Sequence, residues 1–403
     1  MNILQLSKKF PYPVKDGESI ATSYLARAMS DQGVDLTLLS MNTSKHRTDL
    51  SLLPDHFNYY KAVHAVEVDN HLRPADALWN LFFSEESYHV VRFMDAAFSE
   101  ELVRLLSEEQ FDIVQLETLF LTPYVPLIRK HSTARIVLRS HNVEHMIWER
   151  VASNSRFLKR WYLNKITPRL KRYEVEHLNE YDLMVAISKG DLDQFRRLGM
   201  SIPGMVIPIG LASKDYEPDF SVFDRPISIS FIGSLDWMPN VEGLDWFLTE
   251  VWIPLVVPRF PNLTFHIAGR NPPARLMEMS LPGVVVHGEV PSAQDFLNAH
   301  PITIAPLLSG GGMRAKILEG MALGRVVIST RIGMEGIEIE DGVHALLADK
   351  PEEWLSRIEW CLANREQIRT IGAAAVSLCN HSYDHHMIAR RLLEAYRTLL
   401  NKS

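Results

Sequence analysis

The chain has 403 residues, 46% of them hydrophobic and 23% charged, which is the composition of a soluble globular protein and excludes a mainly disordered one. This length exceeds one ordinary core and predicts two domains of about 150 to 200 residues each. A net charge of -7 argues against general nucleic-acid binding, and no window approaches the roughly 20 apolar residues of a membrane span. Because the N-terminus lacks a signal-peptide pattern and the two cysteines form no pair, we expect a cytoplasmic protein.

Short apolar runs alternate with longer helical patterns along the chain, which predicts an α/β fold with parallel sheets covered by helices. In the first half we predict a helix over Ser19–Gln32 and strands over 2–6, 35–40, 113–117, 135–139, 183–187 and 205–209. The second half repeats the rhythm with strands over 227–232, 263–268, 284–287, 302–305, 326–329 and 345–347. We therefore predict two doubly wound, Rossmann-like domains facing a cleft, 1–207 and 227–384, with a linker over 208–226 and a last helix after residue 385.

The most informative segment runs from Ile302 to Thr330 and predicts a strand, a glycine loop, a helix and a strand. Gly310, Gly311 and Gly312 permit close approach of a ligand just before the helix predicted over Met313–Leu323. The N–H groups at a helix N-terminus bind anions, so the pattern favours a phosphate site. It matches neither GxxxxGK[ST] nor, after the first strand, GxGxxG, which disfavours a P-loop protein and a dinucleotide enzyme.

Charged side chains on the same helix extend this prediction. Arg314 and Lys316 add positive charge that could face a phosphate. Glu319, three residues after Lys316, would instead accept hydrogen bonds from sugar hydroxyls. The alternative is an ordinary surface Lys–Glu pair that follows a glycine-rich turn.

The stretch SGGGMRAKILEGMALGRVVISTRIGMEGI, together with FIGSLDWMPNVEGLDWF, FHIAGR and RSHNVEH, resembles the retaining nucleotide-sugar glycosyltransferases of family four. Those enzymes have the GT-B fold, and the resemblance covers nearly the whole chain. It implies a donor-binding second domain, 227–384, and an acceptor-binding first domain, 1–207. It also implies that the C-terminal helix, 385–403, crosses back to the first domain.

The resemblance assigns roles to residues of the second domain. Glu319 matches the glutamate that binds the donor ribose, and Arg314 and Lys316 would hold the diphosphate. The residues implied in donor binding are Gly233, Gly288, Val290, Ser309, Gly310, Gly311, Gly312 and Met313. The chain departs from the family at Gly311, where a glutamate that contacts the sugar is common, and at Ser234 and Glu242, where a phosphate-binding Arg and Lys are common.

In the first domain, His141 follows a predicted strand and matches the histidine that contacts the reacting sugar. With Arg314, Lys316 and Glu319 it completes the predicted catalytic set. Gly17, Asn142 and Glu144 are implied on the acceptor side. The alternatives are a plain turn at Gly17, a structural role for His141 and a helix cap at Glu144.

A basic and aromatic segment, Arg156–Arg172, reads RFLKRWYLNKITPRLKR. Such a surface can dock on the inner face of an anionic membrane or accept a lipid-linked substrate. The alternative, which the pattern favours slightly, is a solvated helix face whose apolar residues pack inward.

We expect transfer of a hexose-type sugar from a UDP- or GDP-type donor to a hydroxyl of a glycan or lipid-linked glycan in cell-surface polysaccharide assembly. No metal or other cofactor is expected, because Arg314, Lys316 and a helix terminus can replace a divalent cation. The alternatives are a sugar-nucleotide epimerase or phosphorylase on the same frame, and a non-catalytic sugar-nucleotide-binding protein.

Overall fold

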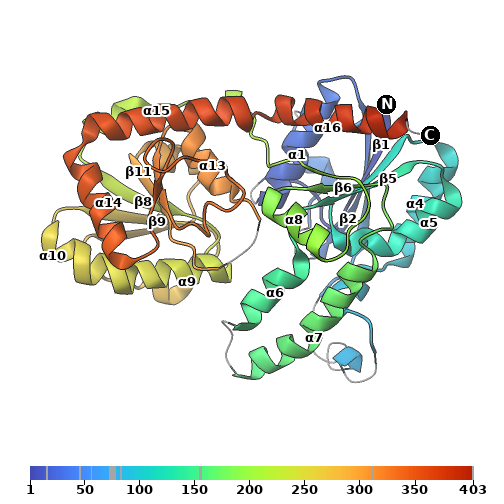
Figure 1. The fold of residues 1–403 in the computed structure, drawn as a ribbon, viewed down its shortest axis with the longest axis horizontal. Coiled ribbons are helices and arrows are strands. Elements are labelled where there is room, and N and C mark those ends of the chain that lie inside the picture. Colours follow the sequence, from blue (N-terminus) through green and yellow to red (C-terminus); the bar gives the residue numbers. More distant parts are fainter. Residues whose placement is uncertain are drawn as a thin grey trace. The chain divides into compact units, whose positions relative to one another are not determined.

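The computed structural model describes residues 1–401 except 15–16, 45–46, 56, 72–78, 82–83, 154–156 and 310–311, and it leaves out the side chains of residues 158 and 159. The chain divides into two compact units (Figure 1). Unit 1 comprises Met1–Gly210 together with the C-terminal segment from His385, and unit 2 comprises Leu211–Asp384.

Across the described part of unit 1, seven strands form one parallel sheet in the order β3-β2-β1-β4-β5-β6-β7. The strands are β1 (Asn2–Ser7), β2 (Asp35–Thr43), β3 (Ala62–Val68), β4 (Ile113–Leu116), β5 (Arg135–Ser140), β6 (Leu183–Ala186) and β7 (Gly204–Val206). The central strands are buried on both faces, because helices cover a parallel sheet on both sides.

The helices of unit 1 form a layer on each face of this sheet. The longer ones are α1 (Gly17–Ser30), α4 (Ala96–Glu108), α5 (Val125–His131), α6 (Glu144–Ser153), α7 (Phe157–Glu176), α8 (Lys189–Arg197) and α16 (His385–Leu400). Short turns of helix are η2 (Leu50–Leu52), α3 (Tyr88–Val91) and η3 (Leu119–Tyr124). Side chains of α4, α5 and α8 pack on one face, and those of α1 and α16 pack on the other.

Helix α16 joins unit 1 through an apolar stripe. Ile388, Leu392 and Tyr396 lie at i, i+4 and i+8 and are buried against α1 and the sheet. The helix itself runs beside α1 (Figure 1). The last helix of the chain therefore completes one face of the first unit's core.

In unit 2, the strands within the described residues form a six-stranded parallel sheet in the order β10-β9-β8-β11-β12-β13. They are β8 (Ser228–Ile232), β9 (Thr264–Ala268), β10 (Val284–Gly288), β11 (Ile302–Ala305), β12 (Val326–Ser329) and β13 (Leu346–Leu347). The helical segments are η4 (Ser213–Asp215), η5 (Phe220–Asp224), α9 (Met238–Trp246), η6 (Phe247–Val256), α10 (Val257–Arg259), α11 (Ala274–Met277), α12 (Ala293–Asn298), α13 (Ala315–Ala322), α14 (Pro351–Ala363) and α15 (Arg365–Ser382). The predicted fold class, two doubly wound Rossmann-like units, is confirmed.

Several details differ from the sequence-based prediction. Strand β3 was not predicted; it is an edge strand, AVHAVEV, whose Ala and Val residues are interrupted by His64 and Glu67 and are mostly half-buried. Strand β7 begins and ends earlier than predicted, at Gly204–Val206. The segment predicted as a linker packs into unit 2 from Leu211 onwards, with Val222 and Phe223 buried in its core.

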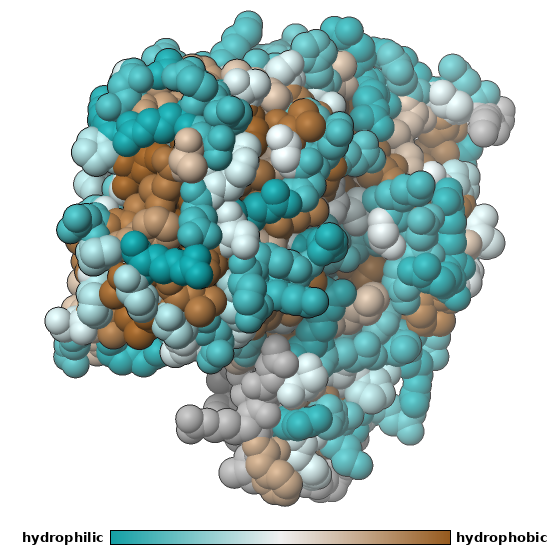
Figure 2. All heavy atoms as spheres, turned by 60° about the vertical axis from the view of Figure 1, so that its left-hand side comes forward, coloured by the Kyte–Doolittle hydropathy of each residue, from teal (hydrophilic) through white to brown (hydrophobic). Residues whose placement is uncertain are grey.

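In the part of the chain that the structure describes, no helix is long and apolar enough to cross a membrane. Hydrophilic residues cover most of the surface seen in the space-filling view, with hydrophobic patches between them (Figure 2).

Candidate functional site

The strand order of each unit predicts where a ligand binds. In unit 2 the order reverses between β8 and β11, and in unit 1 it reverses between β1 and β4. Doubly wound sheets bind ligands beyond the carboxyl ends of the strands at this reversal. The residues that follow β8 and β11 in unit 2, and those that follow β1, β4 and the neighbouring β5 in unit 1, are therefore the first place to look for chemistry.

Glycines end three neighbouring strands of unit 2. Gly233 and Gly269 directly follow β8 and β9, and Gly288 ends β10 with φ +69°. A Cβ on Gly269 would lie 1.8 Å from the carbonyl oxygen of Gly233, so the backbones at the ends of β8 and β9 touch. Val290 follows Gly288 and is partly buried. These ends offer backbone groups, rather than side chains, to a ligand.

We expect Gly269→Ala to destabilise the protein by about 1 to 3 kcal/mol, because the added methyl group overlaps a backbone oxygen that cannot rotate away. Urea unfolding of this variant checks the expectation. The control is Gly190→Ala, because Gly190 does not have a positive φ and a Cβ there would lie 3.8 Å from its nearest neighbour, Ser188 Oγ. Gly342→Ala would not serve, because Gly342 has a positive φ. Equal unfolding midpoints for Gly269→Ala and Gly190→Ala would contradict the close contact.

Helix α13 begins at Ala315, two residues later than predicted. Arg314 is the N-cap residue, with extended backbone at φ −99° and ψ 97°, so Met313 and Arg314 belong to the loop. The Arg314 guanidinium donates to the carbonyl oxygen of Gly312, which has φ +72°. The predicted residues Gly310 and Gly311 lie outside the described residues. The guanidinium charge therefore lies against the end of the glycine loop.

Lys316 projects from the first turn of α13 toward the end of β8. Its Nζ donates to Asn240 Oδ1 at 2.8 Å and lies 4.4 Å from the centre of the Phe231 ring. A Cβ on Gly233 would lie 3.3 Å from the same nitrogen. Burial, and then the charge of Arg314, lower the pKa of Lys316 to about 7. Without an anion this ammonium group is only partly ionised at neutral pH.

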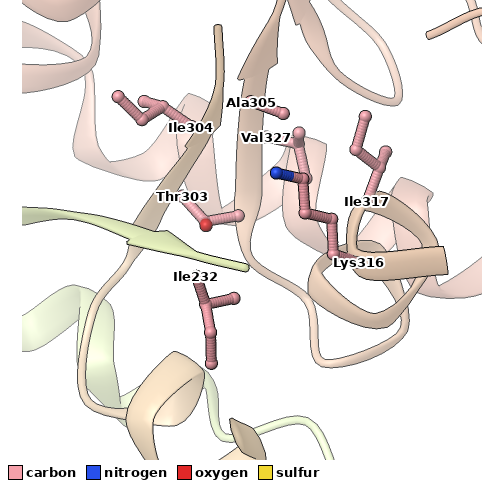
Figure 3. Close-up of a pocket in the computed structure, with 7 residues that line it drawn as sticks. All are labelled: Ile232, Thr303, Ile304, Ala305, Lys316, Ile317 and Val327. Carbon is pink, nitrogen blue, oxygen red and sulfur yellow. The ribbon is translucent and has the colours of Figure 1, made fainter. Parts of the chain in front are cut away.

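A narrow space between α13 and the sheet is lined by Lys316 and six uncharged residues (Figure 3). In Figure 3 the Lys316 side chain extends from its helix with its nitrogen directed toward the sheet. The space is too small to admit a water molecule. It is therefore part of the packed interior next to the strand ends and not itself a ligand cavity.

Asn240, which sequence analysis missed, fixes the position of Lys316. Its Oδ1 accepts from Lys316, and its Nδ2 donates to the carbonyl oxygen of Ser234 at 2.9 Å. The amide therefore has a single orientation, with the oxygen toward the ammonium group. A polar residue in the buried first turn of α9, directly after Pro239, is the signal that could have identified it.

Glu319, one turn beyond Lys316, is held by Tyr216. The Tyr216 hydroxyl donates to Glu319 Oε1 at 3.0 Å. Burial raises the pKa of Glu319, and the hydrogen bond from Tyr216 opposes this rise. One carboxylate oxygen thus has a protein donor, and the other can accept from a ligand hydroxyl.

Ser309, at the start of the glycine loop, donates to Glu242 Oε2 at 3.3 Å. A carboxylate thus contacts the loop where the sequence comparison with the family leads one to expect a lysine. The positive side chains described at the start of α13 are those of Arg314 and Lys316.

At the corresponding edge of unit 1, His141 contacts a buried carboxylate. Its Nε2 lies 3.1 Å from Glu117 Oε2, and Arg139 Nη1 donates to the same oxygen at 2.9 Å. The Arg139 and Glu117 side chains are 1% and 0% exposed. Burial alone would raise the pKa of Glu117, but Arg139 and the hydrogen bonds from His141 and Gln5 hold it at about 2.

The same geometry fixes the protonation of His141. Burial lowers its pKa, and the hydrogen bond to Glu117 opposes this. The lowered pKa favours the neutral form of the ring at neutral pH. Because the ionised Glu117 can only accept, Nε2 carries the ring proton, and Nδ1 keeps a lone pair that can accept a hydrogen bond.

The other predicted first-unit residues lie near the same strand ends. The backbone oxygen of Asn142 accepts from Ser140 Oγ at 2.7 Å, and Gly17 is the first residue of α1. Glu144 begins α6, but the carboxylate of Glu174 provides the cap, accepting from the N–H of Glu144 at 3.0 Å. Burial raises the pKa of Glu144 to about 7, opposed by the charge of Lys8.

Among the described residues, Asp31, His385 and His386 form the only group of three side chains that could together hold a metal ion. Asp31 follows the last turn of α1 and His385 begins α16. Helix α1 starts at the carboxyl ends of the strands and runs back, so this group lies at the opposite edge of the sheet from Glu117 and His141. It takes no part in the candidate site, and the expectation of a metal-free reaction stays a prediction.

The basic segment predicted to touch a membrane forms most of α7, although Arg156 lies outside the described residues. Its buried apolar residues among those described are Leu163, Ile166 and Leu170, which pack inward. Phe157 and Trp161 are 83% and 47% exposed. The inward-packed alternative thus holds for one side of the helix, and membrane contact stays a prediction for the other.

Comparison with known families places both units. A model described as Glycosyltransferase Family 4 matches residues 16–212, and one described as Glycosyl transferases group 1 matches residues 226–364. A protein of Klebsiella pneumoniae, described as an uncharacterized 44.6 kDa protein in the cps region, is 26% identical over 292 residues, which are 68% of this chain and 72% of that protein.

Solved structures with the same fold cover the whole chain. Sucrose-phosphate synthase from Thermosynechococcus elongatus matches with a TM-score of 0.75 and 14% identity over 100% of both chains. HepE of Anabaena in complex with UDP-glucose matches with a TM-score of 0.69 and 15% identity, over 99% of this chain and 100% of that one. TarM of S. aureus, in a complex that includes UDP, matches with a TM-score of 0.66 and 10% identity, over 98% of this chain and 99% of that one. With two family models that together span most of its length, the chain belongs to the GT-B glycosyltransferases, as a family 4 region followed by a group 1 region.

Proposed function

We propose that the protein transfers a hexose-type sugar from a UDP- or GDP-type donor to a hydroxyl of a glycan or lipid-linked glycan. In this proposal the anomeric configuration is retained and neither a metal nor another cofactor takes part. The observation that supports it best is the position of Lys316, a buried ammonium group at the end of β8 beside the loop that leads into α13.

Departure of the donor diphosphate creates negative charge on its oxygens. Lys316, Arg314 and the N–H groups at the start of α13 lie on one side of the β8–β11 reversal and can stabilise that charge. Such preorganised donors perform the electrostatic task that a divalent cation performs elsewhere. The leaving phosphate can then take the proton of the acceptor hydroxyl, so a separate general base is not required.

Glu319 is proposed to bind the donor ribose, and His141 is proposed to contact the transferred sugar. The oxygen of Glu319 that does not accept from Tyr216 can accept from the ribose hydroxyls. The neutral ring of His141 can accept a hydrogen bond from a sugar hydroxyl at Nδ1, because its Nε2 is directed at Glu117. Gly17, Asn142 and Glu144 are proposed on the acceptor side.

The acceptor class rests on relatives. The Klebsiella protein is described by its place in the cps region, and TarM was solved in complex with fondaparinux, alpha-GlcNAc-glycerol and UDP. Both favour a glycan acceptor and polysaccharide assembly, and the UDP in the HepE and TarM complexes favours a UDP-type donor.

A panel of UDP- and GDP-sugars tests the proposal. A matching donor should raise the melting temperature, since a ligand that binds only the folded state stabilises it. With an acceptor glycan, NMR of the first product should show the anomeric configuration of the donor, with and without EDTA. Binding without turnover would favour the non-catalytic alternative, isomerisation of the free donor would favour an epimerase, and an inverted product would contradict the retaining assignment.

Glu319→Ala should raise the KM for the donor by about 10- to 100-fold with a smaller change in kcat, because it removes a charged acceptor of ribose hydrogen bonds. The control is Glu366→Ala, an exposed glutamate in the first turn of α15. Initial rates over a range of donor concentrations measure both constants. An unchanged donor KM in Glu319→Ala would reject the ribose assignment.

A further inference from the structure

A buried network of side chains connects the C-terminal helix to His141. Gln5 in β1 and Gln115 in β4 are register partners in neighbouring strands, so their side chains lie on the same face of the sheet. Both are fully buried, and each is flanked by apolar residues of its strand. Gln115 is in turn the register partner of Val137 in β5. Glu117 lies two residues beyond Gln115 and Arg139 lies two residues beyond Val137, so both side chains are on that face too.

The two amides converge on one oxygen of Glu117. Gln5 Nε2 donates to Glu117 Oε1 at 2.5 Å, and Gln115 Nε2 donates to the same oxygen. The other oxygen, Oε2, accepts from Arg139 and faces His141. The carboxylate is thus held at both oxygens, and its remaining contact is the imidazole.

Two tyrosines decide which way these amides face. The Tyr60 hydroxyl donates to Gln5 Oε1 at 2.8 Å, and the Tyr396 hydroxyl donates to Gln115 Oε1 at 2.5 Å. Burial raises the pKa of both tyrosines well above its ordinary value, so both hydroxyls keep their protons. Each amide oxygen therefore points at a tyrosine, which leaves its NH2 group for the carboxylate.

Removal of one tyrosine hydroxyl would free an amide to rotate. A buried amide oxygen without a donor is costly, and a rotated amide would present its oxygen to an ionised carboxylate. Repulsion from that oxygen would displace the Glu117 carboxylate, and the ring of His141 would lose its fixed orientation. The effect would start in α16, at Tyr396, which lies 281 residues from Gln115 in the sequence.

We propose that Tyr396 and Tyr60 are positioning residues for His141, and that α16 thereby completes the reacting end of unit 1. This proposal rests on the proposed function in one respect, the contact of His141 with the transferred sugar. It makes the last helix of the chain part of the catalytic arrangement as well as of the core.

Tyr396→Phe tests the proposal by removing one hydroxyl and leaving the ring that packs in the core. Tyr60→Phe should act in the same direction through Gln5, and it serves if the first variant folds poorly. The matched control is Tyr181→Phe, which removes a buried hydroxyl hydrogen-bonded to Thr122 at 2.6 Å on the other face of the sheet.

Two readouts separate the network from the reaction. In protein labelled with ¹⁵N-histidine, with the His141 signals assigned by His141→Gln, we expect the Nε2-protonated ring in the wild type and in Tyr181→Phe. Tyr396→Phe and Tyr60→Phe should change those signals and lower kcat by about 5- to 10-fold, with donor KM within about twofold of the wild-type value.

Unchanged His141 signals in both tyrosine variants would overturn the proposal. Changed signals with an unchanged kcat would overturn its catalytic part and show that His141 does not touch the reacting sugar. If the wild type transfers no sugar, the proposed function fails, while the ¹⁵N spectra still decide whether Tyr396 and Tyr60 orient His141.

Discussion

Lys316→Met is expected to lower kcat for sugar transfer by about 100- to 1000-fold, the size of effect seen when one preorganised donor to a developing negative charge is lost. Methionine keeps the length of the lysine stem, and its thioether can pack on the Phe231 ring that now lies 4.4 Å from the ammonium group. The loss would therefore report on charge at the diphosphate and not on a collapsed core. Steady-state kinetics with the matching donor measure it.

The role of Lys316 also predicts the direction in which donor affinity changes with pH. Burial and Arg314 lower the pKa of Lys316 to about 7 in the free protein, so the side chain is about half-ionised at pH 7. A bound diphosphate favours the charged form and raises that pKa, so binding takes up protons near and above pH 7. Donor affinity should fall as the pH rises above 7, and proton uptake should disappear in Lys316→Met.

Calorimetry in buffers of different ionisation enthalpy measures this proton uptake directly. Lys214→Met is the control, because Lys214 is an exposed lysine of the same unit in the short helix η4. Equal kcat values and equal proton uptake for wild type and Lys316→Met would show that the diphosphate does not lie beside this ammonium group.

The local signals in the sequence sufficed for the frame of this site but not for its contacts. Apolar runs and the glycine loop predicted the strands, and the last helix is observed over His385–Leu400 as expected. The partner of Glu319 was not predicted, because Tyr216 lies 103 residues away in a segment without periodicity. Asn240 and Lys316 likewise meet only when β8 and β11 are neighbours, and that order is a property of the folded sheet.

The network beneath His141 shows which signal was available. A glutamine in each of two apolar strands, ILQL and IVQL, is a buried polar residue that must find a partner in the fold. The position of His141 after a strand was sufficient to identify it, whereas the partners of the two glutamines were not predicted. One partner, Tyr60, lies just before β3 and the other, Tyr396, lies in α16, and no spacing along the chain relates them.

The second large effect is expected on stability. Glu117→Gln should lower the free energy of unfolding by about 3 to 5 kcal/mol, because it leaves the buried Arg139 charge without its carboxylate. Glutamine has the same size, but its NH2 group can accept nothing. Gln5 and Gln115 both donate to Oε1 and Arg139 donates to Oε2, so any orientation of the new amide places its NH2 against a donor.

The pH dependence of stability follows from the same carboxylate. Its pKa is about 2 in the folded protein, below the ordinary value of 4.5, so the stabilisation is complete above about pH 4.5 and is lost as the pH falls toward 2. Urea unfolding at pH 7 and pH 4 should show a smaller loss on acidification for Glu117→Gln than for the wild type. Glu108→Gln, at an exposed glutamate, serves as the control.

A double variant tests the cause of the lost stability. If the free energy of unfolding falls in Glu117→Gln because Arg139 is left unpaired, then adding Arg139→Met should recover much of it, since an apolar replacement of a buried ion pair is often neutral. A double variant as unstable as the sum of the two single ones would instead show that Glu117 and Arg139 contribute independently, and the ion pair would not be what holds the carboxylate beneath His141.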